Sequence, residues 1–196
     1  MSRTLHQAGG DVIRDLLSIA DLLEEPQLAR LYAHLAREGE ATVRELMDNL
    51  DLPQGTAYTY VNRLVDAGVL EERNDEQPHS YVAREIDLTV TAGDGTGEYT
   101  ITPALIDAAA RRATDDDVDT YIHRHGIAGL AAALTYAVSR ERGEVPHRMM
   151  ADDLDISPLA AEIILQALRP VVYEHFDIDG SGVSVGGSTE SHHQRR

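Results

Sequence analysis

The sequence predicts a mainly α-helical chain with small antiparallel β-hairpins. Apolar residues recur at helical spacing over most of the chain, and short strand-like runs occur in pairs around turn-forming residues. A third observation is an internal repeat, because Tyr32–Leu64 placed on Tyr136–Leu168 gives ten identical positions, whereas average composition would give only about two or three. With 42% hydrophobic residues, the 196-residue chain can build the packed core of one large domain or two small ones.

The chain is strongly acidic. Its 34 acidic residues outnumber the 17 basic residues, every basic residue is arginine, and the formal net charge is −17. Such a surface suits a basic partner, or it reflects adaptation to molar salt, where carboxylates stay hydrated while their repulsion is screened within a few ångströms. The absence of lysine and the even spread of acids favour the second interpretation, so we expect a halophilic, archaeal protein.

The sequence carries no sign of export or of membrane insertion. It has no cysteine, which excludes disulfides and thiolate metal sites. It has no signal peptide and no apolar stretch long enough to span a bilayer. We therefore expect a cytoplasmic protein that makes no contact with a membrane.

Four helices are predicted in the first third of the chain. Asp11–Leu23 has apolar residues at helical spacing, and Pro26–Gly39 has a proline at its start and a glycine at its end. Thr42 is a suitable N-cap for a short helix over Val43–Leu50. Pro53–Asp66 then forms a longer helix after a tight turn.

Two hairpins are predicted next. Val69–Arg73 and His79–Glu85 are strand-like runs around the turn composition NDEQP. Leu88–Ala92 and Glu98–Thr102 flank GDGTG in the same way. Each pair predicts two antiparallel strands.

The rest of the chain predicts helices and a further hairpin. Thr102–Gly126 is helical in pattern, and Ile127–Arg140 is acid-free and nearly all apolar, so it should be buried in the core or at a subunit interface. Val172–Ile178 and residues 183–186 are strand-like runs around DGSG. Pro170 should truncate or kink the helix that precedes them.

Helix, short helix, tight turn, longer helix and hairpin is the order of a winged helix-turn-helix. One face of the longer helix is apolar and should meet Leu46 and Leu50 of the short helix. The residues of that face are Ala57, Val61, Leu64 and Val65. The other face is polar, and Leu52–Val65 contains no acid in this acid-rich chain. A face selected only for solubility in brine would be acidic, whereas amides, hydroxyls and tyrosines hydrogen-bond base edges and phosphates.

Over Gln27–Glu85 the chain resembles winged-helix transcriptional regulators of the TrmB, ArsR and MarR type, especially small haloarchaeal members. The resemblance implies a homodimer that binds double-stranded promoter or operator DNA and represses or activates transcription. It places the residues after Pro53 in the major groove and the wing across a phosphate backbone. The sequence indicates no effector ligand.

The expected DNA contacts come from the recognition helix and its surroundings. The expected base contacts are the outward polar side chains Gln54, Thr56, Thr59, Asn62 and Arg63. The expected phosphate contacts are Thr42, Arg44, Tyr58, Arg73 and Arg84.

The second copy of the repeat presents a different outward face. Apolar or acidic residues stand where the first copy has small or polar ones: Leu159 for Gly55, Glu162 for Tyr58 and Ile163 for Thr59. We expect this copy to serve dimerisation or regulation instead of reading DNA. The helix Ile127–Val138 and the apolar face with Ile163, Ile164 and Leu168 exceed what so small a unit should cover, so they should build a dimer interface, with Asp11–Leu23 contributing.

The predicted fold is mainly α with small antiparallel β-hairpin wings, in tandem winged helix-turn-helix units joined by a helical linker. Residues 1–101 hold the N-terminal helix and the DNA-binding unit, 102–126 the linker, 127–187 the degenerate second unit, and 188–196 a disordered tail. Two alternatives stay open. The repeat could be a chance alignment, and the winged helices could form a protein-interaction adaptor in transcription or replication that does not read DNA.

Other chemistry is only weakly indicated. His123, His125 and His147 could begin a metal site, but lone histidines at helix ends are more often caps or solvated. Asp115–Asp119 is better explained as a helix start, where acids interact well with the helix dipole. No serine–histidine–acid or paired-carboxylate pattern stands out. We therefore predict no enzyme activity, no cofactor and no metal.

Overall fold

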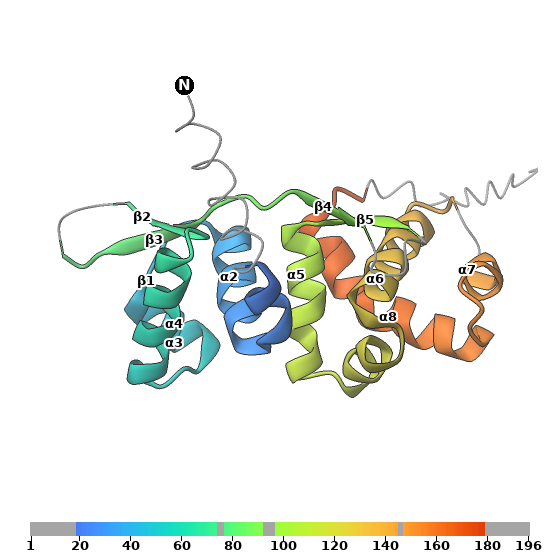
Figure 1. Ribbon diagram of the computed structural model, residues 1–196, viewed down its shortest axis with the longest axis horizontal. Coiled ribbons are helices and arrows are strands. Elements are labelled where there is room, and N and C mark those ends of the chain that lie inside the picture. Colours follow the sequence, from blue (N-terminus) through green and yellow to red (C-terminus); the bar gives the residue numbers. More distant parts are fainter. Residues whose placement is uncertain (1–18, 74–76, 92–96, 145–146, 179–196) are drawn as a thin grey trace, which may run out of the picture.

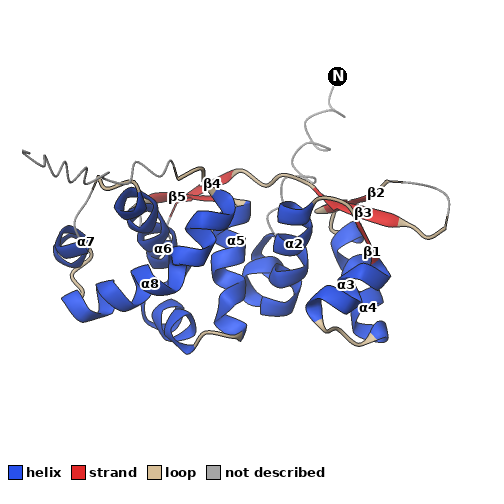
Figure 2. Ribbon diagram, turned by 180° about the vertical axis from the view of Figure 1, so that it is seen from behind, coloured by secondary structure: helices blue, strands red, loops and turns tan. Residues whose placement is uncertain are grey.

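The computed structural model describes residues 19–73, 77–91, 97–144 and 147–178. The helices form a row, and the strands lie along one side of it (Figures 1 and 2). Helices α2 to α4 stand at one end of the row, α5 in the middle, and α6 to α8 at the other end. The structure confirms the mainly helical fold with small antiparallel sheets.

The first end of the row has the element order expected for a winged helix. Helix α2 (Pro26–Glu38), α3 (Val43–Leu50) and α4 (Gln54–Asp66) are followed by the strands β2 (Leu70–Glu72) and β3 (Ser80–Ala83). A strand that the sequence did not predict, β1 (Ala41–Thr42), pairs with β3, so the sheet has the order β1-β3-β2 and is antiparallel throughout.

Local sequence signals explain the turn between α3 and α4. Thr42 caps α3 in a capping box, in which its hydroxyl accepts from the Glu45 amide at 3.3 Å and the Glu45 carboxylate accepts from the Thr42 amide at 2.7 Å. Asp51 ends α3 in the left-handed conformation at φ 53°. On α4, Ala57, Val61 and Leu64 are buried as predicted.

The second hairpin has a sheet of its own. β4 (Leu88–Thr91) pairs antiparallel with β5 (Glu98–Ile101), so the predicted strands are confirmed. The GDGTG turn lies outside the described residues except for Gly97.

The segment predicted as a linker contains the central helix of the molecule. α5 (Pro103–Ala110) is capped by the Thr102 hydroxyl, and every residue from Ala104 to Ala110 is buried. It packs against α2 on one side and against α6 and α8 on the other. The buried residues form one cluster that extends from Ile19 through α5 to Val172.

The far end of the row consists of α6 (Asp116–Glu141), α7 (His147–Asp153) and α8 (Pro158–His175). α6 bends at Gly126, which has φ 67° and is not helical. Ile164 and Leu168 are 1% and 0% exposed within the single chain, because α8 packs on α6. The argument that this apolar surface needs a second subunit to cover it is therefore wrong for these residues, and only Ile163 remains exposed.

The strand predicted near the C-terminal end of α8 is also wrong, because Val172–His175 belongs to α8. Pro170 was expected to truncate or kink the helix, and it does not truncate it. The helix continues because Val171 and Val172 are fully buried on its inner face, whereas Pro170 is exposed and removes one N–H donor. Residues 183–186 and the tail lie outside the described residues. Of the predicted helix Asp11–Leu23, only residues 19–23 are described; they are helical, and the helix continues to Glu24.

No helix in the described ranges combines the length and the apolar character needed to cross a bilayer.

Candidate nucleic-acid interface

The outer face of α4 is polar and exposed. Gln54, Thr59 and Asn62 are exposed, Tyr58 is 49% exposed, and Thr56 is half-buried. The Thr59 hydroxyl donates to the Gly55 carbonyl at 2.7 Å, so its own hydrogen is already used. The helix therefore presents amide, hydroxyl and phenol groups to solvent along one side.

Arg63 lies on the same helix, but two carboxylates hold its guanidinium group. Its NH1 atom is 2.6 Å from Glu25 Oε2, and its NH2 atom is 3.0 Å from Asp21 Oδ2. Hydrogen bonds to Asp21 and Glu25 raise the pKa of Arg63 further. The arginine cannot reach a base edge while it is held in this arrangement.

The arginines of the expected phosphate contacts differ in their partners. Arg84 pairs with Glu71 at 2.8 Å. Arg44 and Arg73 are exposed, and their side chains form no hydrogen bond or ion pair with any other described residue. Both guanidinium groups are therefore available to a phosphate without breaking an ion pair to a described residue.

Thr42 has a structural task. Its hydroxyl is shared between the amide and the carboxylate of Glu45 in the cap of α3, and the residue is half-buried. Any phosphate contact at this position would have to use the free lone pair of the hydroxyl or the start of α3.

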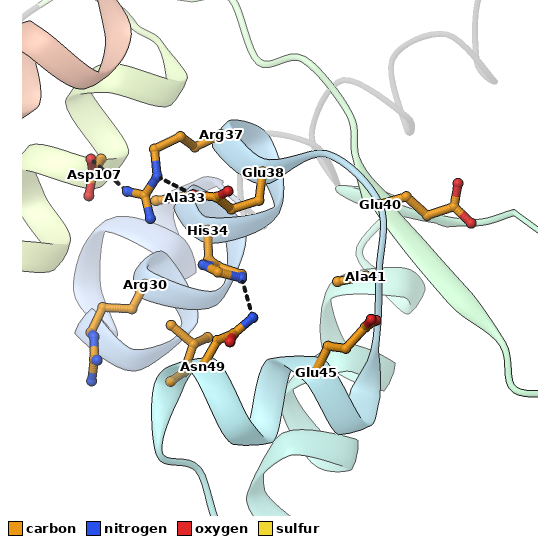
Figure 3. Close-up of a pocket in the computed structure, with 11 residues that line it drawn as sticks. Arg30, Ala33, His34, Arg37, Glu38, Glu40, Ala41, Glu45, Asn49 and Asp107 are labelled. Carbon is orange, nitrogen blue, oxygen red and sulfur yellow. Dashed lines mark hydrogen bonds and ion pairs between the residues drawn. The ribbon is translucent and has the colours of Figure 1, made fainter.

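A polar pocket of about 620 Å³ lies between α2, β1 and α3 (Figure 3). On its wall, buried His34 points at Asn49, whose amide nitrogen lies 3.3 Å from His34 Nε2. Burial, and then the charge of Arg37, lower the pKa of His34. A neutral His34 can accept this hydrogen bond, so the pair ties α2 to α3. Arg37 of the wall pairs with Glu38, whereas Arg30 donates to Gln27 and Glu45 accepts from Thr42.

A second charge network ties α2 to the far end of the molecule. Asp107 of α5 lies 2.9 Å from His175 Nε2, and the Glu174 carboxylate lies 2.9 Å from Arg37 and 2.8 Å from Arg111. Asp107, Glu174 and His175 are close enough to suggest a metal site. The two guanidinium groups already balance the two carboxylates, so the arrangement fits an internal ion-pair network better than a cation site.

Burial alone would raise the pKa of Asp107, since it penalises the charged form. The hydrogen bond from His175 and the charges of Arg111 and Arg37 more than compensate, and the pKa of Asp107 lies below its ordinary value. The Asp107 carboxylate is therefore held ionised between three helices.

Comparisons with known proteins agree with the element order at the first end of the row. Residues 28–87 match the family model for the sugar-specific transcriptional regulator TrmB. This range runs from α2 past β3, so it covers the recognition helix and the wing. It confirms the TrmB resemblance and supports a DNA-binding domain of a transcription regulator.

A second family model matches the other end. Residues 112–177 match a family of unknown function, DUF7437. The match begins ahead of α6 and ends just after α8, so it treats both halves of α6 as one unit with α7 and α8. Neither curated proteins nor solved structures give a match.

Proposed function

We propose that this protein is a sequence-specific DNA-binding transcriptional regulator that acts as a homodimer in high salt. The observation that carries the proposal is the outer face of α4 from Gln54 to Arg63, which is polar, mostly exposed and free of acids in a chain of net charge −17. Arg44 before it and Arg73 after it have no acidic partner among the described residues. TrmB-type regulators bind DNA.

The proposed contacts follow from this geometry. Gln54, Thr56, Thr59 and Asn62 face the bases, and Arg63 joins them once Asp21 and Glu25 release it. Arg44, Arg73, Tyr58 and Thr42 meet phosphates, and Arg84 does so if its pair with Glu71 opens. Since molar salt weakens the gain from arginine–phosphate contacts, hydrogen bonds to base edges supply more of the affinity than in most regulators.

We further propose that α7, α8 and the second half of α6 repeat the unit of α2, α3 and α4. Corresponding residues of the two units share rare backbone conformations, since Asp51 and Asp155 have φ 53° and 49°, and Gly39 and Gly143 have φ 89° and 75°. The turns also share a hydrogen bond at matching positions: Leu52 N to Met47 O and Ile156 N to Ala151 O. The matching φ values and hydrogen bond at these positions support a repeat over a chance alignment.

The second unit is proposed to have lost DNA reading. At the start of α8, Leu159 is 70% exposed and Ile163 is 38% exposed. Glu162 is held by both terminal nitrogens of Arg140, at 3.0 and 3.1 Å. This surface offers apolar contact in place of hydrogen bonds, which suits dimerisation or regulation.

An adaptor that binds other proteins without reading DNA is the second candidate. It is favoured by the exposed apolar side chains Met149, Leu159 and Ile163 on α7 and α8. In that case the polar face of α4 would have no nucleic-acid role.

An electrophoretic shift assay with genomic fragments in molar potassium chloride separates the two candidates. We expect a subset of fragments to be retarded, and light scattering of the same sample to give about 43 kDa, twice the 21.5 kDa of one chain. If the protein is a monomer, retards no fragment and is recovered with a stable protein partner, the adaptor replaces the regulator as the proposed function.

The contact of Arg63 with its two acids predicts that Glu25→Gln tightens DNA binding. Loss of this 2.6 Å ion pair leaves Arg63 held by Asp21 alone, at 3.0 Å. Exposed pairs of this kind are worth up to about 1 kcal/mol, so Arg63 is released more easily and we expect a gain of a few fold. Fluorescence anisotropy of a selected duplex measures it.

Glu24→Gln is the matched control, because Glu24 is exposed and has no partner among the described residues. It removes the same charge without touching Arg63. An equal gain in both variants would mean that only net charge matters and that Asp21 and Glu25 do not restrain Arg63.

A further inference from the structure

A cavity away from the outer face of α4 lies between β5, the first turn of α5 and the second half of α6. Its volume is about 750 Å³, within the usual range for small-molecule sites. The β4–β5 hairpin covers one end of α6 in both views (Figures 1 and 2). Leu154, just after α7, and Phe176, just after α8, complete the wall.

The cavity exists because the side chains of α6 on this side are too small to fill it. Residues 127–139 carry no charge, and the opposite side of this stretch is buried in the core. The side under β5 has Ala128, Gly129, Ala131 and Ala132, all half-buried. A β-carbon at Gly129 would lie 2.5 Å from the β-carbon of His125, so the bend of α6 requires a glycine there.

Some polar side chains of the wall already form hydrogen bonds within the protein, and others do not. Thr100 bonds to Thr89, the Thr102 hydroxyl caps α5, and the Thr135 hydroxyl donates to the Ala131 carbonyl. The remaining polar side chains of the wall form no interaction with other described residues, and they are Glu98, Tyr99, Ser139 and Arg142.

We propose that this cavity binds a small apolar molecule that carries one carboxylate. Its apolar body lies against the alanines of α6, and its carboxylate pairs with Arg142, whose planar guanidinium offers two parallel donors. The hydroxyls of Tyr99 and Ser139 are available to the same carboxylate.

The expected charge of the ligand follows from the positive charge of Arg142. An exposed acid such as Glu98 is expected almost anywhere, since the chain has 34 acids. Arg142 lies at the rim of the cavity and its side chain pairs with no described acid, so its guanidinium is available to a ligand. A ligand that forms an ion pair with Arg142 must be an anion, whereas a ligand that forms an ion pair with Glu98 would be an amine.

Binding at this position would join the hairpin that follows the winged helix to the C-terminal helices. A regulatory role for this cavity rests on the proposed function, but binding of the carboxylate to the cavity does not. The test therefore contains no DNA, and its failure would leave the proposed function untouched.

Isothermal titration calorimetry with octanoate, octanol and octylamine in molar potassium chloride tests the proposal on the full chain. We expect octanoate to bind at one site per chain, more tightly than octanol, and octylamine not to bind. Arg142→Gln should weaken octanoate about tenfold or more, as the loss of a charged hydrogen bond does.

Arg124→Gln is the matched control, since Arg124 is an exposed, unpaired arginine in the described part of α6 away from the cavity wall. Ala132→Leu and Ala131→Leu fill the cavity, and each variant that keeps the circular dichroism of the parent should bind no octanoate. Should both misfold, the Arg142→Gln and Arg124→Gln pair decides alone.

Several results would overturn the proposal. They are no saturable octanoate binding, tighter binding of octylamine, equal weakening by Arg142→Gln and Arg124→Gln, or unchanged binding in a folded cavity-filled variant. An effect of Arg142→Gln on thermal stability without any effect on octanoate would show that Arg142 only stabilises the end of α6.

Discussion

Asp107→Asn should destabilise the protein by about 2–3 kcal/mol, because it removes the buried negative charge that joins α2, α5 and α8. Arg37 and Arg111 keep Glu174 as a partner, at 2.9 and 2.8 Å. The loss of stability is therefore smaller than if both guanidinium groups had no acidic partner. Guanidinium chloride unfolding at neutral pH in molar potassium chloride measures the loss.

The pH dependence of this variant tests the cause. The pKa of Asp107 is below its ordinary value of 3.8 in the folded protein, so the stabilisation is present above about pH 4 and is lost as the pH falls through the folded-state pKa. The difference between parent and variant should therefore shrink in acid. Asp119→Asn is the control, because the Asp119 carboxylate is 55% exposed and lies 3.5 Å from Arg112, and it should change stability by less than about 0.5 kcal/mol. Equal losses in the two variants would contradict the special role of Asp107.

Asn62→Ala should cost about 1–3 kcal/mol of DNA binding and relax discrimination at one base pair. Asn62 is exposed on the outer face of α4, and a carboxamide can both donate to and accept from the edge of an adenine. Fluorescence anisotropy with the selected duplex and with single-base variants of it measures both effects.

Gln166→Ala is the matched control, since Gln166 occupies on α8 the position that Asn62 has on α4. Its amide donates to Glu162 at 3.2 Å, and its loss should leave DNA binding unchanged. The slope of log affinity against log salt should be shallow, because few arginines meet phosphates. If Asn62→Ala binds like the parent while Gln166→Ala abolishes binding, the reading helix is α8.

The helices and hairpins of the first end could be predicted from the sequence because their signals are local. Thr42 with Glu45 marks the start of α3, and the spacing of Ala57, Val61 and Leu64 assigns the inner face of α4. The exposure of Gln54 and Asn62 follows from the same spacing. Strand β1 was missed, because two residues carry no periodicity and its pairing with β3 is distant in the chain.

The failed predictions depended on tertiary packing. The predicted strand Val172–Ile178 starts with a β-branched and an aromatic residue, yet burial of Val171 and Val172 against the core keeps the chain helical to His175. The ion pairs of Arg63 were invisible for a similar reason, since Asp21 and Glu25 lie 42 and 38 residues away in sequence. Helical periodicity showed that Arg63 faces outward but not what it meets there.

The burial of α5 has a consequence for evolution and for engineering. A duplicated unit usually stays exchangeable, because each copy folds around its own interior. Here α5, which lies between the two proposed copies, is buried from Ala104 to Ala110 in one cluster with residues of both. The proposed DNA-binding part is therefore not a separable unit that ends at residue 101, and a chimaera that borrows it must include α5 together with the helices that pack on α5.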